Sequence, residues 1–129
     1  MSAKGAEEPG MERTCVSKSS ALKDYLTLVA SLPVPGEGDL ERLEQALAAG
    51  DAGAGLALTE GFLGLVIAEA SSRRGQGLRF EALIAAGNRG LAEALRQQGG
   101  RLRQRVLREV RRSLRGALAR SAARRAQEA

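Results

Sequence analysis

Histidine and tryptophan are absent from this chain of 129 residues, and cysteine occurs once, as Cys15. Without histidine and with a single thiol, the chain lacks the usual general bases and the ligand sets of zinc sites. We therefore expect no enzyme activity, no metal site and no cofactor. Because Cys15 has no partner for an internal disulfide, a reducing, cytoplasmic setting is expected.

Aromatic residues make up only 2% of the chain, so the core must be built from Leu, Val, Ile and Ala. Such a composition favours helix over strand, and no segment alternates with period two for long enough to form a strand. We predict an all-α fold, a compact helical bundle. No stretch approaches the roughly 20 apolar residues of a membrane span, so no membrane contact is expected.

Turn and capping signals divide the chain. Residues 1–19 are polar and lack any period, which predicts a disordered N-terminal lead; residues 20–125 are predicted to form a single domain, and 126–129 a tail. Helices are predicted over 21–31, 40–49, 52–73, 80–97 and 101–123, with Ser20, Asp39 and Asp51 as N-caps of the first three. The 52–73 helix is apolar on most sides, which predicts a place at the centre of the bundle. Gly64 in this helix suggests close helix approach, and Gly87 and Gly90 a kink in the next.

Charge is distributed unevenly along the chain. Residues 1–70 contain five Lys/Arg and eleven Asp/Glu, a balance of −6, whereas residues 71–129 contain fifteen Arg and four Glu, a balance of +11. A chain polarised in this way indicates a polyanionic partner for its basic half.

The last predicted helix has two distinct faces. At 100° per residue its apolar residues fall on one side, and the opposite side carries a stripe of arginines, namely Arg101, Arg105, Arg108, Arg112 and Arg115. Guanidinium groups fork onto phosphate oxygens, so this stripe is a candidate nucleic-acid surface. The alternative interpretation is a solvated helix face, with Glu109 as a partial counterweight.

Residues 25–91 also follow a family pattern without a gap. The matching positions are Tyr25-Leu26, Pro33, Leu43, Gly50-Asp51, Leu63, Leu65-Val66-Ile67-Ala68, Gly75-Gln76-Gly77-Leu78, Phe80, Leu83-Ile84, Gly87-Asn88 and Gly90-Leu91. This order and spacing resembles the bacterial RNA polymerase sigma factors of the primary, housekeeping type, over their second domain and the segment just before it. The resemblance implies a role in transcription and a helical bundle like sigma factor domain 2.

The resemblance also implies two contact sites. DNA contact would involve Arg101 and Arg111 together with the stripe, at the place where sigma factors recognise and open the promoter −10 element. Contact with the clamp helices of the largest polymerase subunit would involve Phe80, Leu83, Ile84 and Asn88. Three polar positions of the family's clamp-binding segment are alanines here, Ala82, Ala85 and Ala86, which weakens that contact.

The aromatic side chains with which sigma factors hold unpaired bases are missing. The family's tryptophan pair is replaced by Arg108-Glu109, and no aromatic residue follows Phe80. Base stacking of that kind contributes roughly 1–3 kcal/mol per base, so the chain is not expected to melt promoters alone.

Three hypotheses follow from these observations. The chain is a small sigma-like transcription protein that binds DNA, polymerase core or both, alone or with a second sigma-like subunit. Alternatively, it is a protein-interaction module that binds polymerase, a sigma factor or an anti-sigma protein without reading DNA. The third is a sequence-independent nucleic-acid binder on the same scaffold.

Overall fold

The computed structural model describes residues 10–32 and 35–128, with the backbone alone for residues 10–20. These residues form helices and no strand, which confirms the all-α prediction. The described residues fall into two compact units, one that ends at Ser31 and one that begins at Leu32. This boundary lies within the range 20–125, over which a single domain is predicted.

The first unit contains one helix, α2, over Gly10–Ser31. The helix starts well before the predicted Ala21 and continues through Ser20, so Ser20 is not an N-cap. The helix thus includes residues 10–19 of the segment for which disorder is predicted, and residues 1–9 lie outside the described residues. Any role of the Cys15 side chain also lies outside them.

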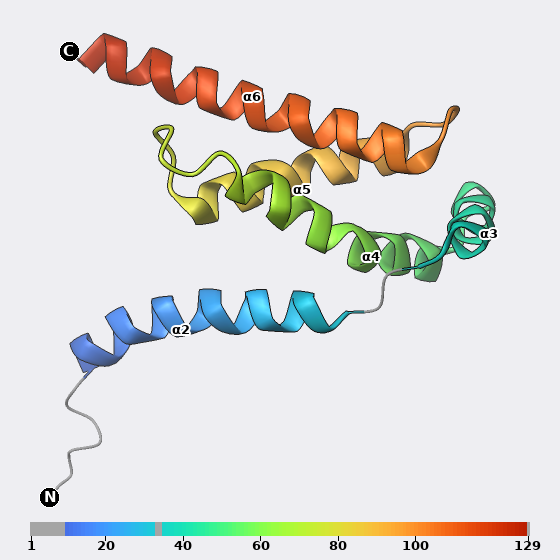
Figure 1. Ribbon diagram of the computed structural model, residues 1–129, viewed down its shortest axis with the longest axis horizontal. Coiled ribbons are helices and arrows are strands. Elements are labelled where there is room, and N and C mark those ends of the chain that lie inside the picture. The colour runs from blue at the N-terminus through green and yellow to red at the C-terminus, as the bar shows by residue number, and fades with distance from the viewer. Residues whose placement is uncertain (1–9, 33–34, 129) are drawn as a thin grey trace, which may run out of the picture. The chain divides into compact units, whose positions relative to one another are not determined.

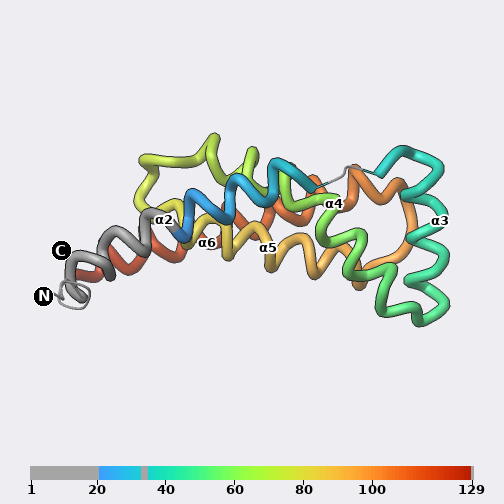
Figure 2. Tube along the Cα trace, turned by 90° about the horizontal axis from the view of Figure 1, so that it is seen from below, coloured from blue at the N-terminus to red at the C-terminus, as the bar shows by residue number. Residues whose placement is uncertain are grey.

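The second unit consists of four helices, α3 over Glu37–Ala48, α4 over Ala52–Ser71, α5 over Phe80–Arg96 and α6 over Leu102–Glu128. The longest shared contact is between α5 and α6, which lie along each other (Figure 1). Helix α4 packs on α5 and also touches α3 and α6. Helix α3 lies across one end of the other three (Figure 2).

Local signals explain most of the helix boundaries. Gly50 ends α3 in a left-handed conformation with φ 96°, and the Asp51 side chain then accepts a hydrogen bond from the amide of Gly53 at 2.9 Å, as predicted for the N-cap of α4. The predicted cap at Asp39 is wrong. Helix α3 begins at Glu37 after Gly36, and Asp39 in its first turn pairs with Arg42 instead.

Helix α4 buries one residue in every four, so its core contact is a single row. The buried residues are Ala54, Leu58, Phe62, Val66 and Ala70, which form the i, i+4 ridge that packs into neighbouring helices. Leu56, away from this row, is 62% exposed. The composition of α4 had suggested a helix enclosed on all sides. In the structure it touches three neighbours, but it is not enclosed on all sides.

The apolar character of α4 bears on the expectation about membranes. Among residues 10–32 and 35–128, α4 is the one helix whose length and composition would suffice to cross a bilayer. Composition alone is a weak indication of a span, since core helices share it. Here the buried row of α4 packs against other helices of its unit.

Two glycines of α5 allow the closest helix contacts. A Cβ on Gly90 would lie 2.5 Å from the carbonyl oxygen of Glu109 and 2.7 Å from the Cα of Val110, and a Cβ on Gly87 would lie 2.7 Å from Cγ1 of Val66. Helix α5 runs unbroken through both positions. The two glycines thus allow α6 and α4 to pack closely against α5. They do not produce the predicted kink. The predicted close approach at Gly64 is wrong, because a Cβ there would meet no atom within 4 Å.

Candidate nucleic-acid interface

Helix α6 presents one face to the core and the other to solvent. Gly99 and Gly100, with φ values of 95° and 72°, turn the chain back after α5. The apolar face of α6 then packs against α5 through Leu102, Val106, Val110, Leu114 and Ala117, all buried. This apolar face is where its periodicity predicted it to be, and it determines which arginines point outward.

Arg105 does not belong to the exposed stripe. Its side chain is 3% exposed, and its guanidinium donates to the carbonyl oxygens of Ala94 at 2.9 Å and Gly99 at 2.7 Å. A third bond, of 3.0 Å, reaches Oε2 of Glu44 on α3. The prediction that Arg105 lies on an open DNA-binding surface is therefore wrong. Arg105 sits at the margin of the stripe, where α3 and the α5–α6 turn cover it, and it ties the three segments together.

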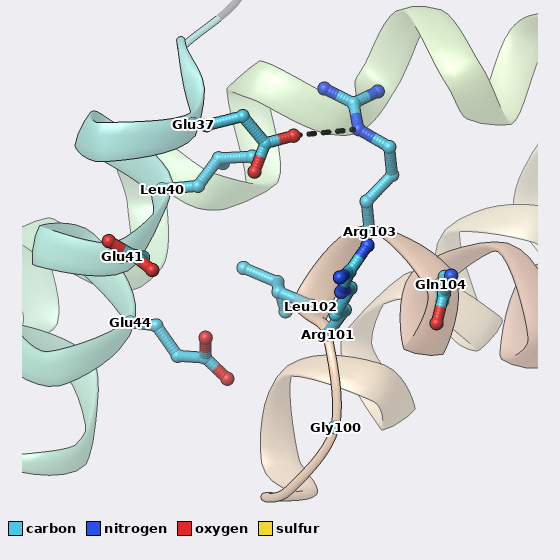
Figure 3. A pocket seen from close by; sticks show the side chains of 9 residues that line it. All are labelled: Glu37, Leu40, Glu41, Glu44, Gly100, Arg101, Leu102, Arg103 and Gln104. Carbon is cyan, nitrogen blue, oxygen red and sulfur yellow. Dashed lines mark ion pairs between the residues drawn. The ribbon is translucent and has the colours of Figure 1, made fainter.

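Arg101 lines a pocket of about 500 Å³ between α3 and the start of α6 (Figure 3). Across the pocket lie Glu37, Glu41 and Glu44 of α3, and Arg103 approaches Glu37 with its Nε 4.0 Å from Oε2. The three carboxylates balance Arg101, Arg103 and the neighbouring Arg105, so this place has no excess of positive charge. The start of α6 therefore attracts a polyanion less than an uncompensated arginine surface would.

Arg108 and Arg112 share one buried carboxylate. The side chain of Glu109 is 4% exposed, and its Oε2 accepts from Nε of Arg108 at 3.3 Å while its Oε1 lies 3.8 Å from Nη1 of Arg112. Both arginine side chains remain more than half exposed, at 57% and 66%. The single carboxylate beneath them orients the two guanidinium groups and neutralises only one of the two charges.

Arg115 extends this surface by one further turn. It is exposed and forms no hydrogen bond or ion pair within residues 35–128. Arg108, Arg112 and Arg115 therefore form a continuous cationic strip, here called the outer arginine face, which follows the 4-3 spacing predicted from the sequence. It carries three positive charges above one buried negative charge.

Arg111 points to a different side of α6, toward α4. Its Nε and Nη2 donate to the two carboxylate oxygens of Glu69 at 3.0 and 3.3 Å, and Glu69 also pairs with Arg73 at 3.1 Å. The hydrogen bond from Arg111 is the main reason why the pKa of Glu69 lies below its ordinary value, and Glu69 in turn raises the pKa of Arg111. Arg111 thus flanks the outer arginine face with its charge already paired. The sequence analysis had not identified Glu69 as its partner.

The residues predicted to contact polymerase lie mostly in the core. Leu83 and Ile84 are buried, and Phe80 is 9% exposed, because these side chains share the face of α5 that packs on α4 and α6. Asn88 is half-buried, and its carboxamide oxygen is enclosed without a hydrogen-bond partner among the described residues. The prediction that Phe80, Leu83 and Ile84 form a docking surface is wrong. Exposed positions of α5 include Glu81, Ala85, Arg89 and Ala92.

No aromatic ring is available for stacking on bases in residues 35–128. Phe62 is 3% and Phe80 9% exposed, and these are the two aromatic side chains of this part of the chain. The outer arginine face therefore offers charge without a stacking platform. Surfaces of this kind bind phosphates and do not read bases.

The sequence matches no known protein-family model and no curated protein. The resemblance to sigma factors accordingly stays a prediction that rests on the pattern over residues 25–91.

Proposed function

We propose that this chain binds nucleic acid through its backbone phosphates, using the outer arginine face of α6, and that it acts in transcription as a sigma-like accessory protein. The observation that carries the binding proposal is the arrangement of Arg108, Arg112 and Arg115 above the single buried carboxylate of Glu109. The transcription context comes from the resemblance alone.

The proposal differs from the sequence-based one in the residues that it uses. Arg105 is excluded because it is buried, and Arg101 because it faces the three glutamates of α3. Arg111 contributes less because two hydrogen bonds hold its guanidinium on the carboxylate of Glu69. With no exposed ring in residues 35–128 to hold an unpaired base, the binding is expected to be independent of sequence and to leave the duplex closed.

Contact with RNA polymerase remains part of the proposal as a second partner. Such contact would have to use exposed side chains of α5, among them Glu81 and Arg89, because the apolar residues predicted for it are in the core. A pull-down of core polymerase with the full chain tests this partner independently of DNA. Capture of polymerase by a chain that binds no DNA would favour a protein-interaction module.

The experiment on DNA measures the affinity for a random duplex of about two turns at salt concentrations from about 50 to 200 mM. For each phosphate contact the log–log slope steepens by about 0.9 on duplex DNA. The triple variant R108A/R112A/R115A should therefore lose up to about 2.7 of the slope and bind more weakly at the lowest salt.

The matched control removes three exposed cations elsewhere, in the variant K23A/R42A/R89A. It changes the net charge equally and should change the slope far less. Equal affinity and equal slope for the wild type and the α6 variant would refute the proposal and leave the arginines as a solvated face. Equal losses in both triple variants would show that net charge, and not the outer arginine face, causes the binding.

A further inference from the structure

The loop between α4 and α5 carries a second group of cations, remote from the outer arginine face. This loop, over residues 72–79, contains Arg73, Arg74 and Arg79 and no acidic residue. Its Gly75 and Gly77 have φ values of 84° and 113°, which fold the chain back tightly. Arg73 pairs with Glu69, a carboxylate that it shares with Arg111, so Arg74 and Arg79 are the two loop cations without a carboxylate partner in residues 35–128.

Hydrogen bonds attach this loop to the C-terminal part of α6. The carbonyl oxygen of Gly77 accepts from Oγ of Ser121 and from Nη1 of Arg125, both at 3.2 Å, and Arg125 also donates to Oγ of Ser121 at 2.8 Å. Ser121 is 5% exposed. A Cβ on Gly77 would lie 2.5 Å from Nη1 of Arg125, so only glycine allows the arginine to take this place.

Arg74 is held by an aromatic ring. Its guanidinium carbon lies 4.1 Å from the centroid of the Phe80 ring, and Phe80 directly follows Arg79 in the chain. A cation–π contact orients the guanidinium and leaves its N–H groups available to donate hydrogen bonds to a ligand. Arg74, Arg79 and Arg125 are all exposed, and we call them the loop arginine cluster.

Half of the sixteen arginines in residues 35–128, including the three of the loop arginine cluster, form no ion pair with a carboxylate. Eight arginines elsewhere pair with Asp or Glu, namely Arg42, Arg73, Arg96, Arg103, Arg105, Arg108, Arg111 and Arg112. Within residues 35–128, Arg74 and Arg125 are positioned by a ring and a carbonyl oxygen, and no ion pair joins any of the three to a carboxylate. Guanidinium groups that are oriented and remain uncompensated are suited to binding phosphate oxygens.

We propose that the loop arginine cluster is a second phosphate-binding site for nucleic acid. This inference rests on the proposed function, because it takes the same ligand, nucleic acid. One duplex is long enough to reach both sites. From Arg108 to Arg125, α6 rises about 25 Å, which corresponds to about seven base pairs at 3.4 Å each. The outer arginine face and the loop arginine cluster lie on different sides of α6. A duplex that contacts both would therefore cross α6 obliquely and cover the end of the α4–α5 loop.

The test compares R74A/R79A with the charge-retaining R74K/R79K and with the control K23A/R42A, using the same random duplex and salt range. Because salt dependence follows charge, R74A/R79A should lose up to about 1.8 of the slope, while R74K/R79K and the control keep theirs. Preserved helicity of R74A/R79A by circular dichroism, with a thermal transition well above the assay temperature, establishes that unfolding is not the cause.

The results separate this inference from the proposed function. A slope reduced by R74A/R79A but not by R108A/R112A/R115A supports the loop arginine cluster and refutes the outer arginine face. The reverse pattern refutes the cluster. Binding of the wild type to vesicles of phosphatidylcholine and phosphatidylserine, abolished by R74A/R79A and without any binding to duplex, would overturn the nucleic-acid assignment in favour of a lipid headgroup.

Discussion

Arg105→Ala separates the sequence-based role of this residue from the one that the structure shows. An arginine on an open helix face would be lost at almost no cost in stability, because exposed substitutions usually change the free energy of unfolding by less than about 0.5 kcal/mol. In the structure the same change removes three hydrogen bonds, which connect α6 with Ala94, Gly99 and Glu44.

The expected loss of stability depends on the groups that Arg105→Ala leaves without a hydrogen-bond partner. Removing one partner of a fully buried ion pair costs about 3–5 kcal/mol. Glu44 is 31% exposed and can be rehydrated, and the carbonyl oxygen of Ala94 keeps the amide of Gln97 at 3.3 Å. We therefore expect a smaller loss, of about 2–4 kcal/mol, and a fall of roughly 10–30 °C in the melting temperature of a unit of this size.

The assay is urea and thermal unfolding followed by circular dichroism. Arg108→Ala is the matched control, since it removes an exposed arginine one turn further along the same helix. Arg105→Lys should recover less than half of the loss, because one ammonium group cannot reach three separate acceptors. If Arg105→Ala proves as stable as Arg108→Ala and instead weakens DNA binding, Arg105 is a surface residue and the reasoning fails.

Two further predictions concern helix packing and pH. Gly90→Ala should destabilise the protein by about 1–3 kcal/mol, because its Cβ would meet the backbone of Glu109 and Val110. Gly64→Ala should instead stabilise it by up to about 1 kcal/mol, because its Cβ would have no atom within 4 Å. Similar urea midpoints for the two variants would contradict this prediction. Glu69 has a folded-state pKa below its ordinary value of 4.5, mainly because Arg111 donates to it, so its contribution to stability is present above that value and is lost as the pH falls through the lowered pKa. The difference in melting temperature between wild type and Glu69→Gln should therefore be largest near neutral pH and disappear in acid, and a difference independent of pH would refute the role of this ion pair.

The helices and their boundaries were largely predictable because their signals are local. Asp51 caps α4 and Gly50 ends α3 as the sequence indicated, since a cap depends on residues two or three positions away. The apolar face of α6 was also predictable, because it follows from the helical period alone. The start of α2 was not, since the polar residues before Ala21 carry no amphipathic signal for a helix.

The composition of the candidate site depended on contacts between segments that are distant in sequence. Periodicity places Arg105 next to Arg101 and Arg112 on a helical projection, yet Glu44, 61 positions away, lies beside it and its side chain is enclosed. Glu109 is buried for a similar reason, since Gly90 brings α5 against its backbone. Helical angle determines the direction in which a side chain leaves its own helix, whereas the neighbouring helix determines whether that direction leads to solvent, to a carboxylate or to the core. Composition and helical period are thus enough to predict an all-helical protein with a cationic last helix, whereas packing between distant segments determines which of its arginines remain exposed to a phosphate.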